Sequence, residues 1–546
     1  MINLLIPPIL IAILLVPVDV TGQQAPRSHS VHLPLSPIEE HEIYCRACAL
    51  FDPDALPPGS PHLLDRASCG TPVVMSLASN WPRLSKATRE AFASLFQRPS
   101  RQRIVISPGG RFKIHYDVSG SNSVSLVDQN SNGVPDYVDE VSRTFDAAWD
   151  LEISELGYDP PLSDGDEFFD VYIENLAPQF VYGFTWPESF GGSVTSSYIE
   201  IDNDYGESIY ATRGLDGLHV TAAHEFFHAI QFAYFSDLSS AGWWHESTAT
   251  WIEDVAYTDV NDYYQYIPFF FDSPTAPLDR KNQFSNVTVF GTAIYAHHLD
   301  RVYGKASIRR TWEVLQSRDR SPYPESLGVL DAGMPLGGFK DVLPRFAVWN
   351  YFTQSRSRSG YYPEASFYPS VKTNTVLQAI CLPVSGTSEV DHLAMDYIQV
   401  PITGHSGGLR AAFRLDADAT WKLLVLLISD TGHEILRPRV ATQIEIPQID
   451  RFSEIVFIPI VTSRQGSRFD AEYTISLDPG IAIASDFVGD LDQNGQVWFP
   501  DFLAFATSFE KDAAAQGYDQ TTDLDGNGKT DFLDFLIFVQ HFGEPS

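Results

Sequence analysis

At 546 residues the chain is too long for one hydrophobic core, so we predict three or four folded units. Its content of 44% hydrophobic and 13% aromatic residues excludes a disordered chain. Lys and Arg number 36 and Asp and Glu 70, so the formal net charge is 36 − 70 = −34. This charge makes nucleic acid and anionic membranes poor partners and divalent cations good ones, although an acidic surface without a special role explains much of it too.

An apolar run that begins at Leu4 predicts a secretory signal peptide over residues 1–22. The run is too short to cross a membrane comfortably, and no later stretch of sequence predicts a membrane span. Residues 23–100 are rich in Pro and show clear helical periodicity only over Leu84–Phe96. They are an N-terminal extension or a propeptide, and the sequence leaves that choice open. We therefore expect a secreted protein, extracellular or at the cell surface.

The four cysteines are too few and too scattered for a fold built on disulfides. Cys45 and Cys48 form a CxxC pair, which binds a metal or contributes a disulfide to Cys69. In an oxidising compartment the disulfide is the milder expectation. Cys381 lies far from the other three in the sequence.

A loop rich in Asp and Asn follows the alternating strand predicted at Arg111–Tyr116. Its oxygen-bearing side chains fall at positions 1, 3, 5, 9 and 12 of a calcium-type loop, and Gly133 at position 6 permits a sharp turn. This spacing predicts a calcium site, and the alternative is an Asx-rich turn that caps the next helix. The candidate ligands are Asp128, Asn130, Asn132, the carbonyl of Val134, Asp136 and Asp139. Helical spacing from Val138 to Leu156 predicts a helix directly after the loop.

The most informative stretch is His-Glu-Phe-Phe-His at residues 224–228. On a helix, His224 and His228 lie one turn apart on one face, so both imidazoles point at one ion. Glu225 lies beside them, where it can act on a water at that ion. The apolar flanks predict a buried helix, in which two histidines without a metal would be desolvated and in need of partners. We therefore favour zinc over structural histidines.

Catalytic zinc usually takes three protein ligands and keeps a fourth position open. The extended motif HExxHxxGxxH is excluded, because the chain has Gln231 and Tyr234 where that motif needs Gly and His. The other route brings a Glu from a following helix. A polar turn over 236–242 predicts a return helix that starts near its end and brings Glu246 level with the histidines. Glu246 is the better third ligand and Glu253 the runner-up.

Two strands are predicted before this pair of helices and two helices after it. The strands are Phe169–Ile173 and Ser197–Ile201, and the helices are Phe290–Gly304, with a Gly stop, and Phe346–Phe352. The first of the later helices offers candidates for stabilising an oxyanion opposite zinc, although each is individually more often a core or surface residue. These candidates, among which the sequence does not choose, are Tyr295, His297, His298 and Tyr303.

The HEFFH motif followed by Glu246 resembles the gluzincin type of zinc metallopeptidase. More narrowly, residues 100–365 are similar to a group of secreted bacterial metallopeptidases. These carry an Asn-Gly-x-Pro-Asp-Tyr-Val loop, here Asn132–Val138, and an HEFFHAIQ helix, here His224–Gln231. The resemblance implies a strand at the sheet edge that holds an extended substrate, and Ser197–Ile201 is the candidate.

The same resemblance implies the roles of the site residues: zinc on His224, His228 and Glu246, with Glu225 as the general base. The chain departs from the thermolysin-like branch at one position. There an Asp four residues after the ligand Glu supports a zinc His, but this chain has Thr250. We expect Glu253 or Asp254 to supply that acceptor instead.

From about residue 385 to 480 the hydrophobic pattern changes to period two, in short β-rich runs between polar turns. The runs are Leu409–Leu415, Trp421–Ser429, Glu454–Ile460 and Ala471–Leu477. They predict an antiparallel β-sandwich of about 100 residues, which serves as a spacer or a binding module.

The C-terminal residues 486–546 contain two near-repeats of a calcium loop, each followed by an aromatic helix. Both place oxygens at positions 1, 3, 5 and 12, Gly at 6 and a backbone carbonyl at 7. The candidate ligands are Asp490, Asp492, Asn494, Gln496 and Asp501 in the first loop, and Asp523, Asp525, Asn527, Lys529 and Asp534 in the second. Two matches in tandem favour calcium over acidic turns. Without calcium, charge repulsion is expected to keep this module loose.

The Asp at position 12 and the layout of one helix per loop resemble type I dockerin repeats, the predicted helices being Phe502–Phe509 and Phe532–Phe542. This resemblance covers only the C-terminal module. It implies docking to a cohesin-like partner or a cell-surface scaffold.

The predicted fold class is α+β multidomain. After the signal peptide and the extension come a gluzincin-like zinc peptidase domain at 101–365, the all-β sandwich at 385–480, and a small α dockerin-like EF-hand pair at 486–546. The predicted function is that of a secreted endopeptidase with one catalytic zinc and a protein or peptide substrate. Two calcium ions belong to the C-terminal module, and the loop at 128–139 is a candidate for a third. The alternatives are a calcium-dependent extracellular scaffold or adhesion protein with an inactive peptidase domain, and a zinc hydrolase for a substrate other than peptide.

Overall fold

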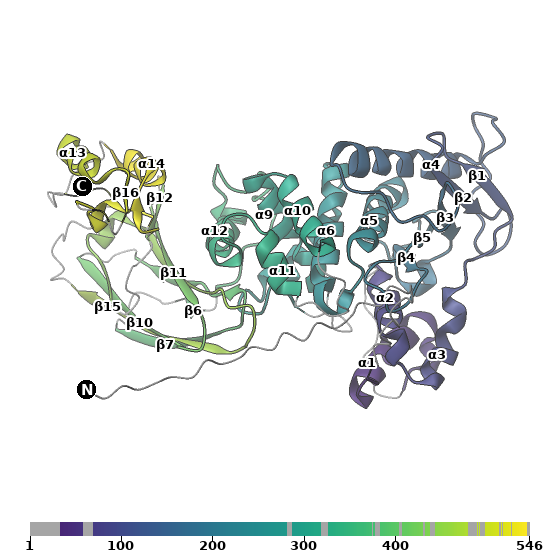
Figure 1. The fold of residues 1–546 in the computed structure, drawn as a ribbon, viewed down its shortest axis with the longest axis horizontal. Helices are drawn as coiled ribbons and strands as arrows, with labels where there is room; N and C mark the ends of the chain where they lie inside the picture. The colour runs from purple at the N-terminus through teal and green to yellow at the C-terminus, as the bar shows by residue number, and fades with distance from the viewer. Residues whose placement is uncertain are drawn as a thin grey trace, which may run out of the picture.

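The computed structural model describes residues 33–57, 69–280, 287–317, 326–373, 375–376, 383–402, 407–429, 432–436, 443–478, 489, 491, 497–512, 515, 517–525 and 527–542. The predicted signal peptide and Cys381 lie outside these residues. Helices and sheets are both present, consistent with an α+β multidomain chain. From right to left in Figure 1, a five-stranded sheet with its helices is followed by a helical block and then by a β-sandwich beside two short helices. Among the described helices, none combines the length and apolar character that crossing a membrane requires.

Three helices form the N-terminal lobe: α1 (Pro37–Phe51), α2 (Thr71–Asn80) and α3 (Lys86–Phe92). Only the third was expected, and it continues as a 3₁₀ turn to Phe96. The Pro-rich composition obscured the first two. Pro37 and Pro72 occupy the first turns of their helices, where a missing backbone N–H costs nothing.

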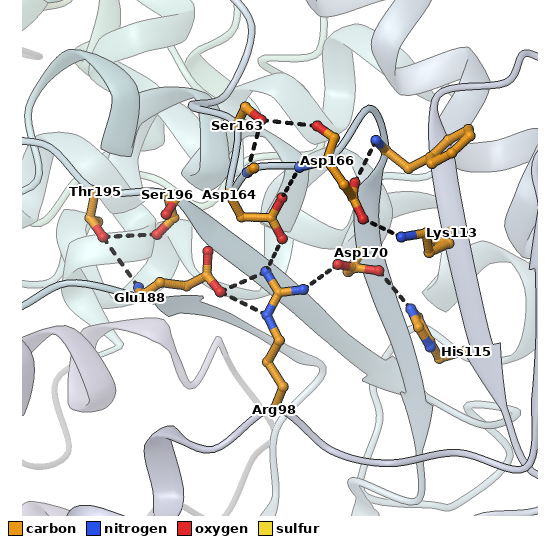
Figure 2. Close-up of polar contacts among 12 residues, drawn as sticks. Arg98, Lys113, His115, Ser163, Asp164, Asp166, Asp170, Glu188, Thr195 and Ser196 are labelled. Atoms are coloured by element: carbon orange, nitrogen blue, oxygen red, sulfur yellow. Dashed lines mark hydrogen bonds and ion pairs between the residues drawn. The ribbon is translucent and has the colours of Figure 1, made fainter.

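The end of this lobe is held to the sheet by Arg98 (Figure 2). Its guanidinium pairs with the carboxylates of Asp164, Asp170 and Glu188. Asp170 is buried and also contacts His115, at 2.6 Å between Oδ1 and Nε2. Although burial alone would lower it, the pKa of Arg98 is raised by these carboxylates, so the guanidinium stays charged.

The five-stranded sheet has the order β1-β2-β3-β5-β4, in which β2, β3 and β5 are parallel and the outer strands β1 and β4 antiparallel. The strands are β1 (Arg103–Ile106), β2 (Phe112–Tyr116), β3 (Phe169–Glu174), β4 (Gly183–Pro187) and β5 (Ser197–Asp202). The expectation that Ser197–Ile201 is the edge strand is wrong. After β4 the chain folds back and places β5 between β3 and β4, so β4 is the edge.

Helix α4 (Asp136–Trp149) connects β2 to β3 and continues as a π-helix through Glu155. The two long helices α5 (Gly214–Tyr234) and α6 (Leu238–Ala256) follow β5. The return helix begins at Leu238, a turn earlier than expected, because the connection needs only Phe235–Asp237. There the Asp237 carbonyl accepts the Ala241 N–H, and the His245 ring lies 2.7 Å from the Phe235 carbonyl.

Shorter helices follow α6 in the chain, and several of them pack on it. They are α7 (Ile267–Phe271), α8 (Thr288–Gly291), α9 (Ala293–Tyr303), α10 (Ala306–Gln316), α11 (Ser326–Gly333) and α12 (Phe339–Tyr351). The helix expected at Phe290–Gly304 is thus α8 and α9, ended by Gly304 at φ +83°, and the one expected at Phe346–Phe352 is the second half of α12. Most of these helices share one apolar core with α4, α5 and the sheet.

The sandwich consists of a four-stranded sheet, β13-β10-β15-β7, and a sheet ordered β12-β11-β14-β9-β6 with β8 paired to β14. Its strands are β6 (Thr375–Val376), β7 (Val384–Val390), β8 (Ala394–Met395), β9 (Ile398–Pro401), β10 (Gly408–Leu415), β11 (Trp421–Ile428), β12 (His433–Leu436), β13 (Ile444–Ile446), β14 (Glu454–Val461) and β15 (Phe469–Asp478). The four expected strands are present as β10, β11, β14 and β15.

The period-two expectation fails for β11 and β14, which are buried on both faces. One face, with Val425 and Phe457, packs inside the sandwich. The other, with Leu426 and Ile458, belongs to the same core as Phe346 of α12. A strand covered on both faces has no polar side to alternate with.

The described part of the C-terminal module contains α13 (Phe499–Ser508), α14 (Phe532–His541) and a small pair of strands, β16 (Lys511–Asp512) with β17 (Lys529–Thr530). Phe505 and Phe538 are buried between the two helices with their rings stacked at 5.2 Å. Both expected helices are therefore present.

Candidate metal centre

Helices α5 and α6 bring the three predicted zinc ligands together. His224 and His228 lie on one face of α5, and each Nε2 faces one oxygen of Glu246 on α6, at 3.5 Å and 3.4 Å. All three side chains are buried, Glu246 to 1% exposure. The three-residue connection between the helices makes them antiparallel neighbours, which sets Glu246 level with the histidines.

Each imidazole is oriented through its other nitrogen. His224 Nδ1 lies 2.6 Å from Glu253 Oε1, and His228 Nδ1 lies 2.7 Å from Gln231 Oε1. Gln231 in turn donates to the Thr248 hydroxyl at 3.0 Å. These contacts turn both Nε2 atoms toward Glu246, as outer contacts of ligating histidines do.

Glu253 therefore orients His224 through its Nδ1, which is one of the two roles expected for Glu253. The other expectation, that Glu253 is the runner-up for the third zinc ligand, is wrong. The other acceptor, Asp254, lies beside His297 on the far side of α6, at 3.8 Å. Gln231 was not expected. Its signal in the sequence is its position three residues after His228, on the same helix face.

The donor set fits a small cation. His224 Nε2 and both oxygens of Glu246 are buried and take part in no hydrogen bond within the described structure. Burial alone would raise the pKa of Glu246, but the imidazoles of His228 and His224 lower it to about 2. Burial alone would lower the pKa of His224, but Cys69, Glu246 and Glu253 raise it well above its usual value. The cluster thus favours a positive charge at this point, and two imidazoles with a carboxylate are a zinc donor set.

The predicted general base, Glu225, lies on the same helix and is 1% exposed. Its Oε2 accepts hydrogen bonds from Thr71 at 2.9 Å and is 2.7 Å from the Thr185 hydroxyl. Thr185 belongs to the edge strand β4, so the carboxylate lies between the metal ligands and the sheet edge.

A fourth donor, Cys69, was not expected at this place. Its Sγ lies 3.5 Å from His228 Nε2, and one ligand atom from each of Cys69, His224, His228 and Glu246 lies within 4.8 Å of all the others. The expected disulfide between the CxxC pair and Cys69 is wrong. Cys48 is a free thiol in the core of the N-terminal lobe, whereas Cys69 is a free thiol at the histidines.

The candidate site borders a small, partly open cavity of about 20 Å³, room for roughly one water. Cys69, His224, Glu225 and Glu253 are among its lining residues, together with Tyr182 and Tyr266. None of the four oxyanion candidates on α9 is among the described lining residues of this cavity. The helix α9 faces away: Tyr295 packs on Phe339 and Phe346, His297 on Tyr263, His298 on Trp349, and Tyr303 near His298.

The loop at 128–139 has the hydrogen bonds of a tight Asx-rich loop. Asp128 accepts the N–H groups of Asn132 and Gly133, and Asn132 Oδ1 accepts the Val134 N–H. Gly133 has φ +87°, a conformation that favours Gly. Asp139 Oδ2 accepts the side-chain amides of Asn130 and Asn132, while Asp136 Oδ1 accepts the Gln129 N–H.

The loop at 523–534 repeats this geometry. Asp523 accepts the N–H groups of Asn527 and Gly528, Asn527 Oδ1 accepts the Lys529 N–H, and Gly528 has φ +86°. Oxygens of Asp523, Asp525 and Asp534 lie within 4.8 Å of one another. Burial, and then the charges of Asp534 and Asp523, raise the pKa of Asp525, so these carboxylates repel one another.

In the first C-terminal loop, Asp490, Asp492, Asn494 and Gln496 lie outside the described residues. Asp501 at position 12 is described and buried. It accepts the N–H groups of Leu491 and Trp498, at positions 2 and 9, as Asp534 does from Leu524 and Asp531 in the second loop.

Comparison with known proteins gives no family. No family model matches the chain, and no curated protein matches it. Among solved structures, the mitogen of Yersinia pseudotuberculosis matches at 12% identity over 19% of this chain and 93% of its own, with a TM-score of 0.16. A family GH115 4-O-methyl-alpha-glucuronidase with specificity for decorated arabinogalactans matches at 8% identity over 59% of this chain and 54% of its own, with a TM-score of 0.13. Neither likeness is close enough to indicate a function.

Proposed function

We propose that this protein is a zinc-dependent peptidase of the gluzincin type, exported from the cell. The observation that carries the proposal is the convergence of His224 Nε2, His228 Nε2 and the Glu246 carboxylate on one point, with Glu225 beside them. The support that Glu253 and Gln231 give to the imidazoles adds to it. So does the burial of polar atoms without hydrogen bonds, which a cation satisfies.

In the proposed reaction, His224, His228 and Glu246 hold the metal. Zinc, when bound, supplies Lewis acidity that lowers the pKa of water and polarises a peptide carbonyl. Glu225 accepts the proton of the attacking water and passes it to the leaving amine. The Gly183 carbonyl and the Thr185 N–H lie on β4, the edge strand, where an extended peptide adds to the sheet.

The C-terminal module is proposed to bind calcium and to attach the enzyme to a cohesin-like or cell-surface partner. The matching loop geometry at 128–139 and 523–534 supports calcium binding at both. The helices α13 and α14 expose apolar side chains, of which Phe499 and Phe532 are each 60% exposed. Exposed apolar helix faces of this kind support a docking role.

The proposal is tested by comparing the protein with its Glu225→Gln variant. We expect about one zinc per chain in both, with hydrolysis of casein lowered by at least about 100-fold in the variant, because the proton acceptor is lost and the ligands are kept. Zinc is measured by plasma mass spectrometry and hydrolysis by release of new amino termini. Because Cys69 lies at the site, the comparison is repeated in the Cys69→Ser background.

Glu200→Gln is the matched control, since Glu200 is a buried carboxylate on β5 that is not among the described lining of the cavity. It should keep zinc and activity. Zinc near zero with calcium present would favour the scaffold alternative. Zinc bound without a sulfur ligand, and without hydrolysis of any peptide in either background, would favour a different substrate class.

A further inference from the structure

The N-terminal lobe places a thiol among the candidate zinc ligands. Cys69 Sγ lies 3.5 Å from His228 Nε2, from a segment that precedes α2 and belongs to neither α5 nor α6. Its neighbours include the Glu246 carboxylate, 1% exposed and without a hydrogen bond. Cys69 also packs against the apolar cluster that contains Tyr266 and Phe290. Two imidazoles, a carboxylate and a thiolate make a complete tetrahedral donor set for zinc.

The residues after Cys69 lie along the sheet edge. The Gly70 N–H donates to the Gly183 carbonyl at 3.0 Å, and the Thr185 N–H donates to the Thr71 hydroxyl at 2.8 Å. Both partners belong to β4. The segment therefore occupies the backbone groups of the edge strand that an extended peptide would use.

The same segment also engages the general base. The Thr71 hydroxyl donates to Glu225 Oε2 at 2.9 Å. With Cys69 in its lining, the remaining cavity of about 20 Å³ admits roughly one water and no peptide. The site is thus closed at the metal position, at the base and at the sheet edge by three consecutive residues.

We propose that residues 69–71 hold the enzyme in a latent form, in which the Cys69 sulfur is the fourth ligand of the zinc. This inference rests on the proposed function. Coordination releases the thiol proton to solvent and leaves no open position for water or substrate. Withdrawal of the segment, by cleavage C-terminal to it or by displacement, opens the position and frees Glu225.

Gly70 provides an independent way to dislodge the segment. Its φ of −87° is ordinary, but a Cβ at this position would lie 2.1 Å from Cε1 of Phe184. Phe184 is a fully buried ring of β4 that packs against both Phe51 and Trp186, so moving it would disturb the core. Gly70→Val therefore forces the segment away from the edge strand while Cys69 itself is unchanged.

The first test is X-ray absorption at the zinc edge on the full-length protein loaded with one zinc. We expect one sulfur at about 2.3 Å in the wild type and none in Cys69→Ser. Cys48→Ala is the matched control, because Cys48 is a buried thiol of the same lobe that lies away from the site. It should keep the sulfur signal. A wild-type spectrum with only nitrogen and oxygen neighbours overturns the proposal, whether or not the protein cleaves peptides.

The second test is hydrolysis of casein by the same proteins. A tethered segment competes with substrate at an effective concentration in the millimolar range, so Cys69→Ser and Gly70→Val should be about tenfold or more faster than wild type. Equal rates in all three would overturn latency and leave the peptidase intact. A zinc–sulfur bond together with no hydrolysis by any variant would overturn latency and the peptidase function together, and would identify a structural zinc site.

Discussion

At the scale of single residues, the orientation of the two imidazoles depends on side chains that do not touch the metal position. Glu253 and Gln231 contact the Nδ1 atoms of His224 and His228, at 2.6 Å and 2.7 Å. Burial raises the pKa of Glu253 to about 8, although the contact with His224 opposes the rise. The contact with His224 therefore partly offsets the cost of burying this carboxylate, so the two groups stabilise each other.

Loss of these contacts should weaken zinc binding. We expect Glu253→Ala and Gln231→Ala each to lower zinc affinity by about 10- to 100-fold, because the rings lose the partners that aim Nε2 at the metal. Competition with a chromophoric chelator measures the affinity. Asp254→Asn is the control, since Asp254 is a buried carboxylate on the same helix that faces His297. An affinity unchanged by either Ala variant would contradict the assigned roles.

Ionisation of the buried Glu200 should make the stability of the protein depend on pH. Burial raises the pKa of Glu200 on β5 to about 7 from 4.5. Between pH 4.5 and pH 7 the folded state holds a proton on Glu200 that the unfolded state has lost. The contribution of Glu200 to stability is therefore fully present below pH 4.5 and is lost as the pH rises through 7. This shift of the Glu200 pKa corresponds to about 3 kcal/mol.

Glu200→Gln removes that dependence, because the amide does not ionise. Relative to wild type, the variant should gain little stability near pH 4.5 and most of the 3 kcal/mol above pH 7. Thermal unfolding of both proteins at pH 4.5, 6 and 8 measures the difference. A gap that does not grow with pH would show that Glu200 is ionised in the folded protein throughout.

At the scale of elements, two loops far apart in the chain have the same backbone hydrogen bonds around a glycine in the left-handed region. In each, the first Asp accepts the N–H groups of positions 5 and 6. The second loop gathers three carboxylates and leads into α14, whereas in the first the Asp139 carboxylate is already engaged by two side-chain amides. The case for calcium therefore rests on loop geometry alone at 128–139, and on loop geometry together with three gathered carboxylates at 523–534.

Measured calcium binding distinguishes a calcium site from an Asx-rich turn at each loop. Asp523→Ala should lower the calcium bound per chain by one and reduce the gain in helical circular dichroism on adding calcium, because the remaining carboxylates no longer form a complete site. Asp128→Ala should lower it by one further ion if the first loop is also a site. Asp416→Ala, an Asx turn in the sandwich, is the control. Full calcium stoichiometry after Asp523→Ala would contradict the C-terminal assignment.

At the scale of the whole molecule, the sandwich is part of the main core. The outer face of β11 and β14, including Leu424, Leu426 and Ile458, is buried against helices such as α12, and Tyr397 donates to the Ala347 carbonyl at 2.9 Å. A spacer, which is one of the two roles expected for the sandwich from the sequence, would not share a core with the neighbouring helices. The interface resembles the interior of one domain.

Truncation tests this arrangement. A chain that ends after Asp478 should keep the unfolding temperature of the main transition, because the C-terminal module has its own small core. A chain that ends after Lys372 should not fold to a soluble form. It would expose side chains that each stabilise the fold by about 1.5–3 kcal/mol, against a total stability of roughly 5–15 kcal/mol. Soluble expression and thermal unfolding report the result, and a stable, soluble short chain would contradict it.

Features that depend on local spacing along the chain are predictable from the sequence. The HEFFH periodicity set two imidazoles on one helix face, and Glu246 was found because a short connection limits how far a return helix can shift. Both loop geometries followed from Gly at position 6, and fewer than half of the described strands followed from alternating or β-rich runs, namely β2, β3, β5, β10, β11, β14 and β15. These features follow from short-range chain geometry, so they do not depend on contacts with distant residues.

Which distant segments meet depends on how the whole chain packs. No spacing links Cys69 to His228, 159 residues away, or makes β4 the edge strand in place of β5. The burial of β11 on both faces, and the turning of α9 away from the cavity, likewise depend on which surfaces cover one another. An apolar surface can be covered equally well by many other apolar surfaces. Local sequence pattern therefore does not specify which surfaces pack together.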